Sequence, residues 1–419
     1  MTRPVRRVAL YGYLASGNLG NDASFETVLG WLSTEHPEVA VSAVTIAPDQ
    51  LSARYGIPAV ALAWTPPGWL PSIVGRLLGR LFDAARSLWL AGRVDAVVVP
   101  GMGVLEETIG VRPWGMPLWL FLVALACRLR ATPFVLLDVG ADRCVSRASR
   151  WLQVATVRLA THVSCRDQRS ADSLVANGAP APAAVVPDLA FAHPAPREVE
   201  VEPGLLVVGV MAYYGPLDDP VAGADVRTRY VDNLASALAR LLDDGGRLAL
   251  VVGDRVDTEV AHDVARAVRA LRPAPPDDLV SVSSTATFDE LTEQMAHAEV
   301  VVASRFHNLI CGLRLARPTV SVGYADKAAD LVRAAGLPDV VQEIDALDPD
   351  LLVDQVRTAR RTSATLSTQI ARTTASWAAE VQGLLEEVSS GVFGLTATAG
   401  PPTRSSSRPA LPTATLPRR

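Results

Sequence analysis

The sequence predicts an α/β fold with two domains, each built on a parallel sheet. Short runs rich in Val, Leu and Ile alternate with helical stretches along residues 5–192, and the alternation resumes along residues 204–347. This alternation is the pattern of βαβ units, and runs that are apolar throughout are typical of strands covered on both faces. The segment 193–203, HPAPREVEVEP, is rich in Pro and charge and separates the two series as a linker. We therefore expect two Rossmann-like domains with parallel sheets that face a central cleft.

The first domain, residues 1–192, contains six strand-like segments and several helical ones. The first apolar run is interrupted from Gly12 onward, which predicts a buried strand rather than a signal peptide. The apolar segment Met116–Cys127 is too short for a bilayer core, which needs about 20 residues, so we expect a buried helix there. The expected strands are 5–14, 38–46, 59–64, 95–101, 133–141 and 161–165, and the expected helices are 23–34, 70–91 and 146–160.

The second domain, residues 204–388, repeats this pattern and closes with one or two helices over Asp348–Val388. Residues 396–419 are mostly Pro, Thr, Ser, Ala and Arg with no acidic residue, so we expect a disordered tail. The expected strands of this domain are 204–213, 247–254, 279–284, 299–305 and 319–325.

Composition excludes several classes of protein. The 419 residues include 39 basic and 44 acidic side chains, a net charge of −5, and 49% are hydrophobic. The chain is therefore neither mainly disordered nor attracted in bulk to nucleic acid. The four cysteines show no metal-ligand spacing and no secretion signal is visible, so we expect a reduced, cytoplasmic protein with no metal site. Only Lys327 among the basic residues is a lysine, which makes it a candidate for a place where a compact ammonium is required.

Ligands of parallel sheets bind beyond the carboxyl ends of the strands, so the segments after strands hold the candidate residues. The first is GYLASGNLGND, residues 12–22, which precedes a helix. Its small residues Gly17, Asn18 and Gly20 are candidates for an acceptor or anion loop at a helix N-terminus. The spacing does not fit GxGxxG, so a dinucleotide site is weakly indicated. The alternative is a tight turn in which Asp22 caps the helix.

Two further strand ends carry charged residues. In DAVVVPGMGVLEE, residues 95–107, Gly101 and Gly103 precede Glu106, which is a candidate base, and the alternative is a solvated acidic turn. In VSCRDQRSADSL, residues 163–174, Arg166 is a candidate donor fork for a carboxylate or phosphate, with Asp188 as its clamp. The alternative is an Arg166–Asp167 pair that pins the helix.

The most specific segment is VVVASRFHNLICGLRLARPTVSVGYADKAADL, residues 300–331. Ser304, Arg305 and His307 end one strand and Lys327 follows the next, so three cations meet at one edge if the strands are neighbours. Only Asp326 is an acid close to them in sequence. The pattern predicts a site for a small, multiply charged anion.

These motifs together resemble the polysaccharide pyruvyl transferase family. The resemblance rests on GNLGND, PGMGVLEE, SCRDQRS, PDLAF and SRFHNLICGL…RPTVSVGYADK, in the family's order, over residues 7–331. It implies a glycosyltransferase-B-like pair of Rossmann-like domains that moves pyruvyl from phosphoenolpyruvate to a sugar as a ketal, on cell-wall or extracellular polymers. It also implies that Arg305 and His307 bind the donor, with His307 as the acid and Arg166 as a partner. The chain departs from the family pattern at Asn21-Asp22, where Asp-Glu is usual, and at Met102, where Gly is usual.

The residue types suit this chemistry. Arg305, Arg166, Lys327 and Ser304 would hold the carboxylate and phosphate of the donor, and a protonated His307 would deliver a proton to the enol methylene. A sugar hydroxyl would then attack, aided by Asp22 or Glu106 as base, and a second hydroxyl would displace phosphate. We expect no cofactor and no metal.

The expected acceptor is a sugar, as a nucleotide-linked or lipid-linked glycan. We expect no transmembrane segment, although the basic tail allows peripheral membrane contact. Two rival functions stay open: a glycosyltransferase of the same architecture that uses a nucleotide sugar, and a non-catalytic anion or glycan binder.

Overall fold

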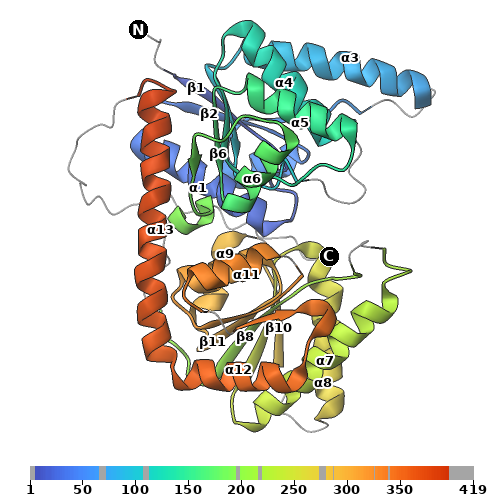
Figure 1. Cartoon of the computed structure of the whole chain (residues 1–419), viewed down its shortest axis with the longest axis vertical. Coiled ribbons are helices and arrows are strands. Elements are labelled where there is room, and N and C mark those ends of the chain that lie inside the picture. Colours follow the sequence, from blue (N-terminus) through green and yellow to red (C-terminus); the bar gives the residue numbers. More distant parts are fainter. Residues whose placement is uncertain are drawn as a thin grey trace.

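A computed structural model of the chain contains two α/β domains, one above the other in Figure 1, each with a parallel sheet. The fold class predicted from the sequence is therefore confirmed. The structure describes residues 5–65, 72–106, 113–194, 199–215, 219–272, 280–285, 287–324, 326–337 and 340–395. The predicted tail, residues 396–419, lies outside the described residues.

The N-terminal sheet has the strand order β3-β2-β1-β4-β5-β6-β7. Successive strands are added on one side of β1 up to β3 and on its other side from β4 onward. The boundary between β1 and β4 is therefore a topological switch point, where parallel sheets bind ligands. Its strands are β1 (Arg7–Tyr11), β2 (Ala40–Thr45), β3 (Ala59–Ala61), β4 (Ala96–Pro100), β5 (Phe134–Val139), β6 (His162–Cys165) and β7 (Ala184–Val185). Its helices are α1 (Leu19–Glu35), α2 (Pro48–Tyr55), α3 (Ser72–Ala91), α4 (Met116–Arg130), α5 (Arg147–Leu159) and α6 (Gln168–Asn177).

The C-terminal sheet has the order β10-β9-β8-β11-β12-β13, with its switch point between β8 and β11. β11 and β12 pair in parallel. The segments that follow them, which carry Arg305, His307 and Lys327, therefore lie at the same edge of the sheet, as predicted. The strands are β8 (Leu205–Val210), β9 (Arg247–Val252), β10 (Val280–Ser284), β11 (Val300–Ala303), β12 (Thr319–Gly323) and β13 (Val341–Glu343). The helices are α7 (Ala224–Asp243), α8 (Thr258–Leu271), α9 (Phe288–Ala296), α10 (Phe306–Arg314), α11 (Asp326–Ala334), α12 (Pro349–Arg361) and α13 (Ser363–Gly391).

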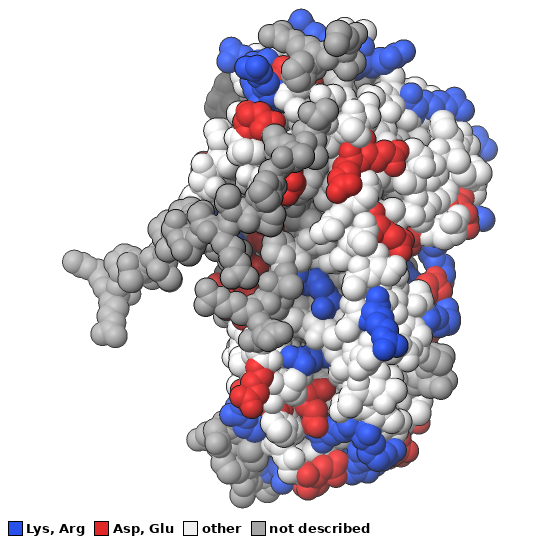
Figure 2. All heavy atoms as spheres, turned by 90° about the vertical axis from the view of Figure 1, so that its left-hand side faces the viewer, with Lys and Arg blue, Asp and Glu red and all other residues white. Residues whose placement is uncertain are grey.

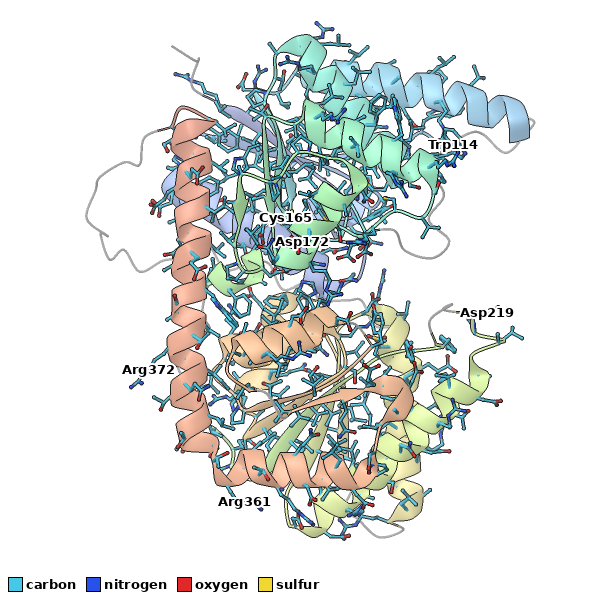
Figure 3. The ribbon with its side chains drawn as sticks, in the orientation of Figure 1. Trp114, Cys165, Asp172, Asp219, Arg361 and Arg372 are labelled. Carbon is cyan, nitrogen blue, oxygen red and sulfur yellow. The ribbon has the colours of Figure 1, made fainter. Side chains whose placement is uncertain are left out.

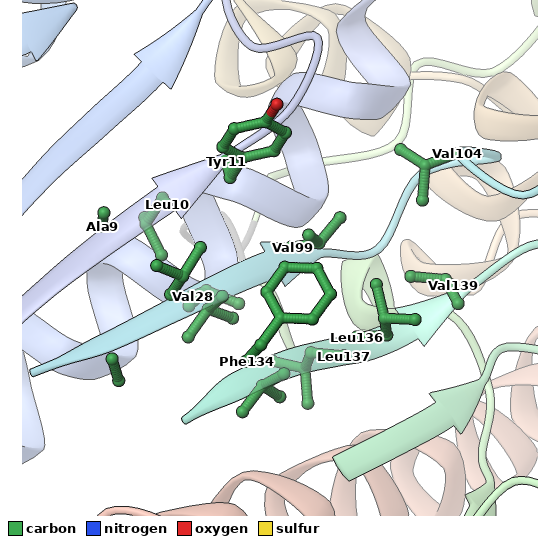
Figure 4. Close-up of a cluster of buried hydrophobic side chains, with 14 of the residues drawn as sticks. Ala9, Leu10, Tyr11, Val28, Val99, Val104, Phe134, Leu136, Leu137 and Val139 are labelled. Atoms are coloured by element: carbon green, nitrogen blue, oxygen red, sulfur yellow. The ribbon is translucent and has the colours of Figure 1, made fainter. Parts of the chain in front are cut away.

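The core of the N-terminal domain shows why the strand pattern is apolar. Leu10 of β1, Val99 of β4 and Phe134 of β5 are fully buried, and Val28 of α1 packs on the same cluster (Figure 4). Burying one such side chain stabilises the fold by about 1.5–3 kcal/mol. Because these strands are held rigidly, the loops after their carboxyl ends are held as well.

Helix α13 changes the expected division of the chain. We placed residues 204–388 in the C-terminal domain, but Val381, Leu385 and Val388 of α13 pack into the N-terminal core, whereas Ile370 packs into a cluster shared by the two domains. The helix has 29 residues and is therefore about 44 Å long, and it runs along both domains in Figure 1. Apolar periodicity predicts a helix but not which of two cores its faces contact.

Two short strands, β7 and β13, do not appear among the predicted elements. Each lies at the edge of its sheet and has only two or three residues, so neither produces a recognisable pattern. Among the residues that the structure describes, no helix combines the length and apolarity needed to cross a bilayer.

Candidate active site

A cavity of about 180 Å3 lies between the two domains at the carboxyl ends of their strands. Its walls come from the segments after β1, β4 and β6 of the N-terminal domain and after β8, β9, β11 and β12 of the C-terminal domain. All the predicted site residues line this cavity except Gly17, Asp22 and Gly101. Those that line it are Asn18, Gly20, Gly103, Glu106, Arg166, Ser304, Arg305, His307 and Lys327.

The N-terminus of α10 points into the cavity. β11 ends at Ala303, and the chain turns at Ser304 and Arg305 before the helix begins at Phe306. Arg305 occupies the N-cap position with an extended backbone, and no side chain in the described part of the chain caps this end. The first N–H groups of a helix have no partner within the helix, so this end carries donors and a partial positive charge. It is therefore suited to an anion.

Asn308 in the first turn of α10 is fully buried and lines the cavity. Within the described residues, neither its amide nitrogen nor its amide oxygen has a hydrogen-bond partner. The amide fits because Gly209 and Gly253 lack side chains: a Cβ on Gly209 would lie 1.9 Å from Nδ2 and one on Gly253 would lie 2.4 Å from Oδ1. Since an unpaired buried amide costs about 1–3 kcal/mol, its position here indicates a ligand or a water as partner.

Arg305 is held by an acid that the sequence analysis did not identify. Its Nε and Nη2 donate to the two carboxylate oxygens of Asp257 at 2.9 and 2.7 Å. Asp257 is fully buried and also accepts a hydrogen bond from the Ala212 N–H at 2.7 Å. Burial alone would lower the pKa of Arg305, but the hydrogen bonds and charge of Asp257 outweigh it and raise that pKa. The guanidinium is therefore a permanent cation with a fixed direction.

Glu106 joins two cations across the domain boundary. It accepts from Nη2 of Arg166 at 2.5 Å and from Nζ of Lys327 at 3.3 Å to each carboxylate oxygen. Burial opposes its ionisation, but the charges of Arg166 and Lys327 prevail and lower the pKa of Glu106 to about 2. Arg166 and Lys327 also lie over the ring of Phe306, at 5.3 and 5.5 Å from its centroid. This carboxylate is ionised at every physiological pH and is a weak base while both cations contact it.

Arg166 is buried between two carboxylates. Besides the bond to Glu106, its Nη1 donates to Asp188 at 3.3 Å, so Asp188 is the predicted clamp. A Cβ on Gly140 would lie 2.7 Å from Nη2 of Arg166, so the glycine makes room for this arrangement. Burial disfavours the charged guanidinium, but the charges of Glu106 and Asp188 outweigh that effect and raise its pKa.

Asp326 is the only acid close to Arg305, His307 and Lys327 in sequence, but it is not the acid that pairs with them. Arg305, Arg166 and Lys327 each contact a carboxylate, and the partners of Arg305 and Lys327 are 48 and 221 residues away in sequence. Asp326, the acid nearest in sequence, instead pairs with Arg169 at 2.8 Å. Only folding brings these acids to the site.

His307 packs its imidazole against the start of α1. A Cβ on Gly20 would lie 2.0 Å from its Nδ1, so only glycine leaves room for the ring. Nε2 lies 3.8 Å from Asp188, beyond hydrogen-bond distance, and has no partner in the described part of the chain. Burial lowers the pKa of His307 to about 4, although the charge of Asp188 acts in the opposite direction. Burial therefore favours the neutral imidazole at neutral pH, and the protonated form expected for the reaction needs a negative charge nearby.

The glycine turn after β1 differs from the predicted anion loop. Asn18 is the N-cap of α1, and its Oδ1 accepts from the N–H groups of Gly20 and Asn21 at 3.0 and 3.4 Å. These donors, which an anion would need, are already satisfied. The N–H of Leu19 donates to the carbonyl of Gly253 at 3.2 Å. The turn thus joins the N-terminal domain to the C-terminal one beside the cavity.

Three predicted residues do not reach the cavity. The carboxylate of Asp22 is buried and accepts from the Ala15 N–H at 2.8 Å and from Arg54 at 3.3 Å, and burial raises its pKa. It stabilises the turn and is not placed to act as a base. A Cβ on Gly17 would meet the side chain of Arg255 at 2.7 Å. Gly101 adopts a φ of +58° beneath Ser24, behind the cavity wall.

A group of three residues with metal-ligand atoms lies elsewhere in the described part of the chain: Glu26, His193 and Asp289. Arg54 approaches Glu26 to 3.7 Å, and the guanidinium of Arg314 donates to the carbonyl of His193 at 2.7 Å. Two cations beside the group disfavour a metal ion there.

The residues absent from the predicted set include Asp254 and Asn308, which line the cavity, and Asp257, which holds Arg305. Asp254 lies two residues after the end of β9, and Asp257 comes three residues later. The strand-end rule that selected the other residues applies to this segment as well and would have found both acids.

Solved structures share this architecture over nearly their whole length. A putative UDP-N-acetylglucosamine 2-epimerase from Listeria monocytogenes has a TM-score of 0.61 and 10% identity, over 93% of this chain and 98% of that one. The Anabaena protein HepE, in complex with UDP and glucose, has a TM-score of 0.59 and 13% identity, over 93% and 100%. A glycosyltransferase from Rickettsia africae has a TM-score of 0.59 and 9% identity, over 94% and 100%. At these identities the likeness shows the fold alone and confirms the glycosyltransferase-B-like arrangement.

The comparison of sequences is more specific. Individual curated proteins give no significant match. The family model of the polysaccharide pyruvyl transferases, however, matches residues 18–326. The match begins at Asn18, the cap of α1, and ends one residue before Lys327, so it includes both walls of the cavity. The chain therefore belongs to the polysaccharide pyruvyl transferase family and is a transferase.

Proposed function

We propose that this protein transfers the pyruvyl group of phosphoenolpyruvate to two hydroxyls of a sugar, forming a ketal and releasing phosphate. The observation that carries the proposal is the uncapped N-terminus of α10, which faces a cavity lined by Arg305, His307 and Lys327. Phosphoenolpyruvate has two anionic groups, and a helix N-terminus flanked by a guanidinium and an ammonium supplies donors for both.

The size of the cavity favours a small donor. About 180 Å3 is available, less than the roughly 300–1,000 Å3 of pockets that enclose drug-sized ligands. Arg305, whose direction is fixed by Asp257, would bind one anionic group, and the donor would supply the hydrogen-bond partner that the Asn308 amide lacks. Lys327 would turn from Glu106 toward the second anionic group, because its 3.3 Å contacts with the carboxylate are long.

In the proposed reaction His307 gives its proton to the methylene carbon, which becomes the methyl group. The carbon that bears the phosphate then becomes electrophilic, and a sugar hydroxyl forms a C–O bond to it and loses its proton. A second hydroxyl forms the other C–O bond and gives its proton to the phosphate, which leaves with the electron pair of the C–O bond that breaks. Glu106 is a carboxylate that lines the cavity beside Lys327, and it would become a stronger base when the donor draws Lys327 away. The reaction needs no cofactor beyond its two substrates.

The negative charge of the donor is also what would protonate His307. A charge about 4 Å away in a medium of effective dielectric constant near 20 contributes about 4 kcal/mol. That is about the free energy needed to return the imidazole from a pKa of about 4 to the neutral range. The acid would thus form only when the donor is bound.

A glycosyltransferase that uses a nucleotide sugar is the second candidate, since HepE holds UDP and glucose in the same fold. Phosphate release would separate the two functions. Phosphoenolpyruvate is incubated with a panel of nucleotide-linked and lipid-linked sugars, and free phosphate and the product mass are measured, with Arg305→Ala as the control. Phosphate release that depends on acceptor and is lost in the control supports the proposal. Stabilisation by UDP-sugars but not by phosphoenolpyruvate, with no phosphate released, would refute it.

A further inference from the structure

Helix α3 exposes a row of large apolar side chains to solvent. Its solvent side carries Leu78, Leu81, Phe82, Leu88 and Trp89, which we call the α3 stripe and which recur at intervals of three, four and seven residues. Leu81, Phe82 and Trp89 are 68, 50 and 47% exposed. The opposite side buries the single acid of the helix, Asp83, which accepts from the backbone of Trp64 and from the indole of Trp119. An exposed apolar row of this length is unusual on a protein surface and marks an interaction site.

The neighbouring helices extend the patch. α4 packs between α3 and α5 on one side of the N-terminal domain, away from α13 in Figure 1. Leu129 at the end of α4 and Trp151 on α5 are 67 and 61% exposed. Trp114, just before α4, is 58% exposed and points away from the domain (Figure 3). Large apolar side chains are therefore exposed on or beside all three helices.

The same three helices are strongly basic. Residues 72–91, 116–130 and 147–159 contain eight arginines and one acidic residue, a net charge of +7, although the whole chain has a net charge of −5. Arg93, just after α3, lies over the ring of Trp89 at 4.9 Å from its centroid. By contrast, the face that carries α13 mixes basic and acidic side chains (Figure 2). The asymmetry predicts a partner that is both apolar and negatively charged.

We propose that α3, α4 and α5 form a surface that docks the protein on an anionic membrane. Exposed Leu, Phe and Trp enter the acyl boundary of a bilayer, and arginines around them contact phosphate headgroups. A second copy of the chain fits less well, because a two-fold contact would place this basic surface against itself. The inference does not depend on the proposed chemistry, since none of these side chains lines the site cavity.

Flotation with vesicles tests the surface in the full-length protein. Vesicles of phosphatidylcholine alone are compared with vesicles that also contain phosphatidylglycerol. The double variant Leu81→Ser/Trp89→Ser removes two members of the α3 stripe, and Arg128→Glu/Arg130→Glu reverses charge at the end of α4. The matched control is Leu271→Ser/Leu351→Ser, which changes two leucines of the other domain with similar exposure, 57 and 46%.

We expect the wild type to float with the anionic vesicles and to dissociate as salt is raised. Both surface variants should bind the vesicles at least roughly tenfold more weakly than the wild type, with unchanged melting temperatures. The control should bind like the wild type. Absence of wild-type binding to anionic vesicles, or equal loss in the control, overturns the proposal. So does a wild-type dimer in light scattering that Leu81→Ser/Trp89→Ser converts to a monomer. If that variant fails to fold, the arginine variant decides.

Discussion

Binding of phosphoenolpyruvate is expected to protonate His307, and the size of the effect can be worked out from the structure. Burial lowers the pKa of the imidazole to about 4, so about one molecule in a thousand carries the proton at pH 7. Relative to its ordinary value this disfavours the imidazolium by about 3 kcal/mol. One negative charge about 4 Å away contributes about 4 kcal/mol, which raises the pKa by about three and brings it to about 7.

The consequence is a measurable proton uptake. Between the free pKa and the higher pKa of the complex, only the complex holds the proton, so donor affinity must fall as pH rises through this window. At pH 7 His307 should take up about half a proton per donor bound, and nearly one at pH 6. Isothermal titration calorimetry in buffers with different ionisation enthalpies measures this number directly.

His307→Gln is the control, because glutamine keeps a polar side chain but cannot titrate. The phosphate of the donor titrates itself, with a second pKa of about 6, and this contribution is the same in both proteins. The difference between them isolates the imidazole. The variant should also lose turnover by roughly 10²–10⁴-fold while it keeps most of its donor affinity. Equal proton uptake in both proteins, or full turnover in the variant, would refute His307 as the acid.

Three other outcomes are expected. Gly20→Ala should abolish turnover, because a Cβ at this position would lie 2.0 Å from Nδ1 of His307 and overlap its ring. Gly30→Ala on the same helix is the control: its Cβ would meet no atom within 4 Å, and the change should stabilise the fold by about 0.5–1 kcal/mol. Thermal melts and phosphate release compare the two variants. Lys327→Ala should raise the KM of the donor and slow turnover, and Lys327→Arg should restore neither fully, because a planar fork replaces a point charge; full activity of the Arg variant would contradict this. A chain that stops at Leu395 should melt like the full chain. One that stops at Gly391 loses the buried Phe393, and its free energy of unfolding in urea should be about 3–5 kcal/mol lower. Equal stability of the two truncations, or a large loss in the longer one, would refute this.

The ion pairs of the cavity change how the site is understood. Arg305, Arg166 and Lys327 are held in place by Asp257, Glu106 and Asp188. A buried cation without an acid would cost several kcal/mol, so the acids stabilise the folded protein. The donor must displace part of this network. At Glu106 the contacts of Lys327, at 3.3 Å, are longer than that of Arg166, at 2.5 Å.

Local sequence patterns were sufficient for the sheets and for most of the site. Alternating apolar runs and helical periods depend on neighbours a few residues apart, which is why eleven of the strand segments could be placed. The rule that ligands bind beyond strand ends then selected Arg305, His307 and Lys327 without any contact being known. Lys327 was also selected because it is the only lysine in the sequence.

Only the tertiary structure decided which groups meet. The acids that pair with Arg305 and Lys327 come from segments 48 and 221 residues away, and the low pKa of His307 results from its burial between two domains. The packing of α13 against the N-terminal core and the exposure of the α3 stripe likewise depend on contacts between distant segments. Periodicity shows that a helix has an apolar face, but what covers that face, and how much water reaches a charged group, depend on contacts between distant parts of the chain.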